Sequence, residues 1–273
     1  MLFIVFVSLI FKLMPHCFRA LALSFFLILV FQNSKAQGLA LGLYETKLSD
    51  DEMDHVQQSL ALQVEFYNLL FGDTIRENIK AKVFGKRSEF NKYAKENTNV
   101  KDVRNMGGYY SPSMKEVVIF KYEKSKFFKS TYSHETSHAI YNMKCDRSEL
   151  WVNEGLAEFF GSLIFENGQV QSEVTSKIIG DIYSTVRSAD KLESFLSSKK
   201  KKEHKVMSSR NYNLSWALVN FLYFNNLEAF SSIIKGMCSD SDSMKAIEQG
   251  YPGGFKSFHK DIKAYYKSLR YSK

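Results

Sequence analysis

Apolar residues recur at helical spacing over most of the chain and at strand spacing in its first half. Positions 56, 60, 64, 67 and 71 are all apolar or aromatic, which predicts a helix over residues 50–71. Residues 79–84 are typical of a short strand, and residues 88–95 predict a helix. Tyr109–Tyr110 and Val117–Tyr122 flank a turn that contains Pro112, which predicts a β-hairpin.

Helices dominate the prediction for the rest of the chain. The expected ranges are 150–165, 174–187, 213–223, 227–235 and 255–268. Strands therefore gather in the first half and helices in the second, a pattern that favours an α+β fold.

The first 36 residues differ in composition from the rest of the chain. They include no Asp or Glu, and Leu21–Phe31 is an apolar run in which Ser24 is the one polar residue. Ser34 and Ala36 place small residues at −3 and −1 of a cleavage site before Gln37, as a signal peptide requires. We therefore expect residues 1–36 to be a cleaved signal peptide and the mature protein to be secreted or periplasmic.

An uncleaved membrane anchor is the alternative for this segment. The apolar run is shorter than the roughly 20 residues that span a bilayer, so we expect no stable membrane span after cleavage. Met14 is a second candidate for the true start, since a complete signal sequence comes after it.

Charge and cysteine content narrow the possible functions. The formal net charge is +8, and about +5 without the first 36 residues, which is a mild excess. Lys199–Lys202 lack interleaved aromatic residues, so we expect a solvated loop and no nucleic-acid partner. Cys145 and Cys238 lie after the signal peptide and are free to pair in an oxidising compartment, whereas no CxxC spacing supports a cysteine-based zinc site.

The strongest chemical signal is His134-Glu135-Thr136-Ser137-His138, an HExxH motif. Histidines four residues apart on a helix project from one face, so both imidazoles can reach one ion. Glu135 comes directly after the first histidine, and its position is that of a general base for a zinc-activated water.

A second motif, from Trp151 to Glu158, supplies the missing carboxylates. A catalytic zinc site usually has three protein ligands, and we predict Glu154 as the third because it lies within an apolar helix. Glu149 is a rival third ligand that precedes this helix. Glu158 lies four residues after Glu154, and we predict that it contacts a ligating histidine, with a solvated position as the alternative.

These two motifs resemble those of the gluzincin metallopeptidases, and in particular the small secreted bacterial peptidase MA-like proteins, several of which were first grouped as a domain of unknown function. The resemblance covers roughly residues 80–270 and includes Gly107–Pro112 and Tyr212–Trp216. It implies a thermolysin-like α+β domain, with a small N-terminal mixed sheet and then a mainly helical part. Residues 79–273 would form this domain, and residues 37–78 a helical segment before it.

The same resemblance implies specific roles for single residues. His134, His138 and Glu154 would bind Zn²⁺, Glu135 would be the catalytic base, and Tyr212 would donate a hydrogen bond to the developing oxyanion. A packing role is the alternative for Tyr212, and His204 is a weaker competitor for its function.

The expected activity is hydrolysis of a peptide or protein substrate by a secreted zinc metallopeptidase. The chain has no Gly-x-Met-Glu-Asn segment of the kind that holds a substrate amine in the related aminopeptidases, so exopeptidase specificity has no support. A zinc amidase acting on a cell-wall or other non-protein amide, and a non-catalytic envelope binding protein, remain as alternatives.

Overall fold

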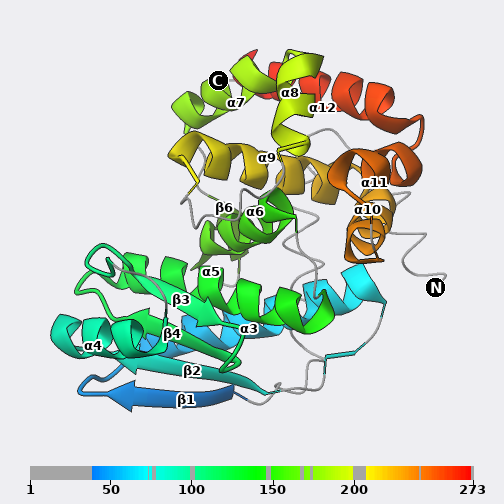
Figure 1. The fold of residues 1–273 in the computed structure, drawn as a ribbon. Helices are drawn as coiled ribbons and strands as arrows, with labels where there is room; N and C mark the ends of the chain where they lie inside the picture. Colours follow the sequence, from blue (N-terminus) through cyan, green and yellow to red (C-terminus); the bar gives the residue numbers. More distant parts are fainter. Residues whose placement is uncertain are drawn as a thin grey trace.

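The computed structural model describes residues 39–72, 74–75, 78–98, 102–145, 149–166, 169–172, 175–198, 207–239 and 241–271. Within these ranges it contains six strands and ten helices, and the helices make up most of the chain (Figure 1). The predicted signal peptide, Lys199–Lys202 and His204 lie outside the described residues. None of the helices in the described ranges has the length and hydropathy needed to cross a membrane.

A four-stranded sheet forms one side of the molecule. Its strands lie in the order β1 (Leu39–Tyr44), β2 (Ile79–Phe84), β4 (Glu116–Phe120) and β3 (Gly108–Ser111). β1, β2 and β4 run parallel to one another, and β3 pairs antiparallel with β4. The predicted strand at 79–84, the predicted hairpin and the mixed character of the sheet are therefore confirmed.

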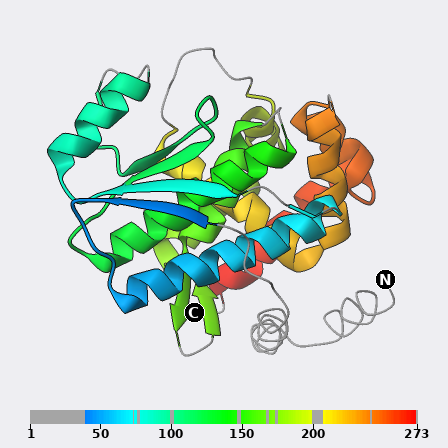
Figure 2. The same ribbon diagram turned by 90° about the horizontal axis from the view of Figure 1, so that it is seen from below.

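Three helices cover the two faces of this sheet. α3 (Asp50–Phe71) and α5 (Ser125–Lys144) lie on one face, and α4 (Arg87–Asn97) lies on the other (Figure 2). Alternation along the strands explains this arrangement, because successive side chains of a strand point to opposite faces. Val117 and Ile119 of β4 join the large core, whereas Val118 packs with Phe90 of α4 in a smaller one.

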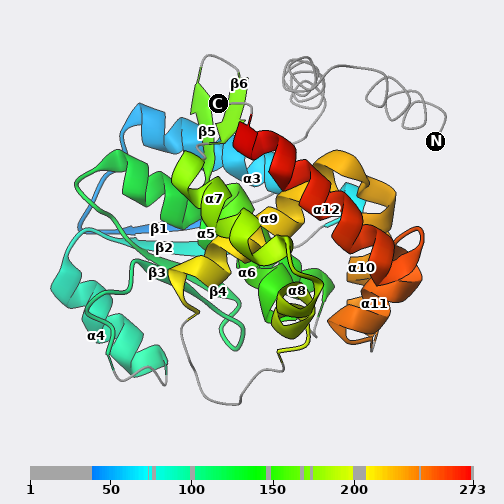
Figure 3. The ribbon, with the colours of Figure 1, turned by 90° about the horizontal axis from the view of Figure 1, so that it is seen from above.

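The remaining helices form the second side of the molecule (Figures 1 and 3). They are α6 (Leu150–Gly161), α7 (Ser176–Val186), α8 (Ala189–Leu196), α9 (Ser209–Asn225), α10 (Leu227–Ser239), α11 (Ser243–Gly250) and α12 (Gly254–Tyr271). α6 packs closely against both α5 and α9, so it connects the sheet-bearing part to the helical part.

Three parts of this architecture differ from the prediction. Residues 163–165 were expected to extend a helix, but α6 ends at Gly161 and Leu163–Glu166 form strand β5, which pairs with β6 (Gln169–Ser172). The segment 37–78 contains strand β1 in addition to the predicted helix. α8 and α11, of eight residues each, were not predicted; helices this short carry little periodic signal.

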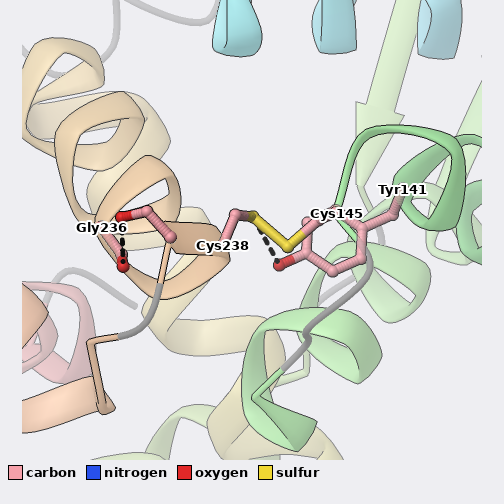
Figure 4. The surroundings of a disulfide bond; sticks show 5 residues. Tyr141, Cys145, Gly236 and Cys238 are labelled. Atoms are coloured by element: carbon pink, nitrogen blue, oxygen red, sulfur yellow. Dashed lines mark hydrogen bonds between the residues drawn. A yellow bond between two sulfur atoms is a disulfide. The ribbon is translucent and has the colours of Figure 1, made fainter.

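A disulfide bond joins Cys145 to Cys238, with their Cα atoms 5.2 Å apart (Figure 4). Cys145 comes directly after α5, and Cys238 lies in α10, so the bond connects the HExxH helix to the helical part. The Tyr141 hydroxyl lies 3.9 Å from Cys238 Sγ beside the bond.

Candidate metal centre

α5 brings the two histidines of the HExxH motif together. His134 and His138 lie one helical turn apart, and their Nε2 atoms are 3.1 Å from each other. Both Nε2 atoms therefore point to the same small volume at one side of the helix. The spacing produces this result, since residues i and i+4 share a helix face.

α6 adds Glu154 to the same point. Glu154 Oε2 lies 3.7 Å from Nε2 of His134 and 3.7 Å from Nε2 of His138. The three residues offer ligand atoms that all lie within 4.8 Å of one another. The rival Glu149 is the residue that precedes α6 and does not belong to this group.

Gly155 explains how α6 reaches this position. A Cβ atom at Gly155 would lie 2.5 Å from the backbone oxygen of Ser215 and 2.8 Å from Val219 Cγ2, both in α9. Only glycine permits such a close approach of the two helices. The residue after Glu154 therefore fixes the distance between α6 and α9.

The donor set fits a divalent cation. Glu154 Oε2 is buried and has no hydrogen-bond partner within the described part of the chain, a costly state for a carboxylate oxygen. Burial raises the pKa of Glu154 to about 7 and lowers the pKa of both histidines, which favours the neutral imidazoles that bind metals. Two imidazole nitrogens and one carboxylate are typical ligands of a catalytic zinc ion.

Two further side chains contact the other nitrogens of the histidines. Asn153 Oδ1 lies 2.9 Å from His138 Nδ1, and Glu158 Oε1 lies 3.5 Å from His134 Nδ1. An acceptor at Nδ1 keeps the proton there and leaves the Nε2 lone pair free for a ligand. Glu158 was predicted at this position from the sequence, whereas Asn153 was missed, although its place directly before Glu154 was a usable signal.

Glu135 lies beside this group, on the side that faces β3. Its pKa is raised to about 8, mainly by burial and also by the charges of Glu154 and Glu158, against the opposing effect of the Tyr110 backbone amide. A Cβ atom at Gly108 would lie 3.0 Å from Glu135 Cγ, so the first residue of β3 passes directly over the carboxylate side chain.

Tyr212 lies in the first turn of α9 and is partly buried. Its pKa is raised to about 12, mainly by burial and also by the charges of Glu154, Glu158 and Glu135. The hydroxyl therefore lies within the electrostatic reach of the three carboxylates. Tyr212 lies 58 positions after Glu154 in the sequence. The packing of α9 against α6 brings it to the side of the molecule where Glu154 lies.

Comparison with known families gives one result for this region. A family model described as "Protein of unknown function (DUF1570)" matches residues 129–242. This range includes the histidines of α5, Glu154 and Glu158 of α6, and Tyr212 of α9. A comparison with curated proteins finds no match.

Proposed function

We propose that this protein is a zinc-dependent metallopeptidase of the gluzincin type, with a thermolysin-like arrangement of its helices. The observation that carries the proposal is the convergence of His134, His138 and Glu154, with the buried Glu135 beside them. A zinc ion bound by these three residues would supply Lewis acidity, polarising a substrate carbonyl and lowering the pKa of an attacking water.

Glu135 has the properties of a general base for that water. Its carboxylate is not among the three grouped ligand atoms and is therefore free to accept a proton. Its raised pKa, about 8, lies near neutral pH, where a group can accept a proton and later return it to the leaving amine. A cation at the site would lower this pKa, so the deprotonated form would prevail at the start of the reaction.

Tyr212 is our candidate for the donor that stabilises negative charge on the substrate's carbonyl oxygen. Its hydroxyl stays protonated at neutral pH because its pKa is about 12. A protonated phenol can donate a hydrogen bond where the negative charge develops, and such donors lower the barrier to acyl transfer.

Strand β3 offers a way to hold an extended peptide. It is the last strand of the sheet order, and within the described residues no further strand pairs with its outer side. It packs against α5, and Gly108 lies beside Glu135. A peptide that added to this edge by backbone hydrogen bonds would lie beside the base.

The compartment proposed for this activity is outside the cytoplasm. The Cys145–Cys238 disulfide supports it, because such bonds form and persist in secreted and periplasmic proteins. A zinc amidase would use the same ligands and base, so substrate profiling with peptides and with non-protein amides separates the two activities.

The decisive experiment measures metal content and peptide hydrolysis together. We expect about one zinc per chain in the parent protein and a large loss in Glu154→Ala. Glu149→Ala, at the residue before the same helix, should keep its zinc. Absence of zinc from a folded parent that has been supplied with zinc would refute the proposal. Zinc without hydrolysis of any peptide or amide would favour the non-catalytic binding protein instead.

A further inference from the structure

The interface between α3 and α5 contains a row of buried, hydrogen-bonded polar side chains. We call it the polar seam, and it consists of His55, Ser59, Gln63 and Tyr67 of α3 and Ser133, Thr136 and Ser137 of α5. All seven side chains are buried, and their positions in α3 are four residues apart. They therefore form one stripe along α3 that faces the HExxH helix.

Three side chains of the seam contact backbone carbonyls in successive turns of α5. The contacts are His55 Nε2 to Lys129 O at 3.1 Å, Gln63 Nε2 to Ser133 O at 3.0 Å and Tyr67 OH to Ser137 O at 3.3 Å. Apolar packing tolerates small sliding and rotation of one helix over another, whereas directional hydrogen bonds to three turns do not. The seam therefore fixes both the position of α5 along its axis and its rotation.

The rotation of α5 matters because two of the contacted residues adjoin the candidate ligands. Ser133 and Ser137 directly precede His134 and His138 in the chain. A rotation of α5 that broke the seam would move both imidazoles away from Glu154, which is held separately by α6. The seam and the candidate metal ligands thus lie on neighbouring faces of one helix.

Gln63 is the central residue of the seam. Its Nε2 lies 3.0 Å from each of three oxygens, Ser59 Oγ, Ser133 O and Thr136 Oγ1. Its own Oε1 is buried and has no hydrogen-bond partner in the described part of the chain. A buried oxygen without a partner costs stability, and each of the three contacted oxygens has a further hydrogen-bond partner. A merely structural interface would therefore lose little if an apolar side chain of equal length replaced Gln63.

We propose that Gln63 is a positioning residue for the metal centre, which sets the rotation of α5 so that His134 and His138 meet Glu154. The inference rests on the proposed function, because it needs a metal at that centre. It assigns a role to a residue 71 positions before the first ligand in the sequence.

The test compares the parent protein with Gln63→Met, which keeps the side-chain length and removes the hydrogen bonds. Gln57→Met makes the same exchange at an exposed position of the same helix. Leu60→Ala removes a buried apolar side chain from α3 and lowers stability without removing a seam hydrogen bond. Each protein is assayed for zinc affinity by chelator competition, for the visible spectrum of its cobalt(II) form and for thermal unfolding of the metal-free form.

We expect Gln63→Met to bind zinc about tenfold or more weakly and to change the cobalt spectrum, as loss of a ligand-orienting contact does. Its metal-free form should unfold at nearly the parent temperature, because the carbonyl of Ser133 keeps its bond within α5. Parent-like affinity and spectrum in Gln63→Met would overturn the positioning role while leaving the zinc site intact. If Leu60→Ala weakens zinc binding as much as Gln63→Met does, the positioning role of Gln63 is likewise overturned, because a general loss of stability would explain both results. A parent that binds neither zinc nor cobalt would overturn this role and the proposed function together.

Discussion

Asn153 Oδ1 lies 2.9 Å from Nδ1 of His138, and Asn153 directly precedes Glu154 in α6. One turn of α6 therefore supplies both a candidate ligand and the contact that orients another ligand on α5. This contact leaves Nε2 of His138 as the nitrogen that faces the candidate metal position.

Replacing Asn153 by Ala should weaken zinc binding by about 10- to 100-fold, because His138 would lose the partner that fixes its ring and tautomer. Chelator competition measures the affinity. Asn153→Asp retains an acceptor at the same place and serves as the control. Equal affinity in the parent and Asn153→Ala would show that the contact does not orient the ligand.

Glu135→Gln should lose nearly all turnover and keep the metal. An amide cannot accept the proton of the attacking water, and loss of a general base typically costs about 10²–10⁴ in rate. Peptide hydrolysis and elemental analysis are measured on the same preparation. Glu96→Gln, at an exposed position of α4, is the matched control. Full activity of Glu135→Gln would exclude the proposed role.

Tyr212→Phe should lower kcat by about 10²–10³, the usual cost of losing one donor to a developing oxyanion. Zinc content should be unchanged, since the phenol is not among the grouped ligand atoms. Tyr223→Phe in the same helix removes a hydroxyl from a residue that packs on Phe66 and Phe159. If both variants lose activity equally, the effect belongs to the packing of α9 and not to the reaction.

Gly155→Ala should destabilise the fold by about 1–3 kcal/mol, because the new methyl group would enter the backbone of α9. Gly180→Ala in α7 makes the same exchange where nothing lies within 4 Å, and it should be neutral or stabilising by up to about 1 kcal/mol. Urea unfolding of the two variants checks both values. A Gly155→Ala protein as stable as the parent would contradict the close approach of α6 and α9.

The stability of the protein should fall on acidification because of His55. Burial is the largest cause that lowers its pKa, to about 4 from the ordinary value of 6.5. The unfolded chain therefore binds the extra proton first, and stabilisation present above pH 6.5 is lost as the pH falls toward 4. Over this pH range the free energy of unfolding should fall by about 3 kcal/mol.

His55→Gln tests this dependence, since a glutamine also has a donor for the Lys129 carbonyl but does not titrate. The free energy of unfolding is measured by denaturant titration at several pH values between about 4 and 7. We expect a smaller loss of stability in the variant than in the parent over this range. Identical pH profiles would show that the parent's loss comes from other groups.

Local periodicity carried much of the prediction. Local sequence patterns were enough to predict three elements, which are the helix at 50–71, the strand at 79–84 and the hairpin before α5. The pairing of His134 with His138 is of the same kind, because the helical repeat alone brings them together. Glu154 was predictable because a carboxylate in an apolar helix needs a partner.

Features that depend on a distant partner could not be derived in this way. A polar stripe at 55, 59 and 63 is compatible with a solvated helix face, and only the packing of α3 on α5 shows it to be buried. Gly155 has no local need for glycine, because the requirement comes from α9. β1 is a strand because it pairs with β2, and β2 begins 35 residues after the end of β1.

The Cys145–Cys238 bond closes a covalent ring that carries Glu154, Glu158 and Tyr212, while the HExxH motif lies on the chain just before it. A single peptide-bond cut anywhere inside the ring, including in the lysine-rich stretch near residue 200, leaves one covalently continuous molecule. Both fragments would stay joined until a reductant opened the bond. A cut at any one peptide bond of the ring would therefore not separate Glu154 from His134 and His138.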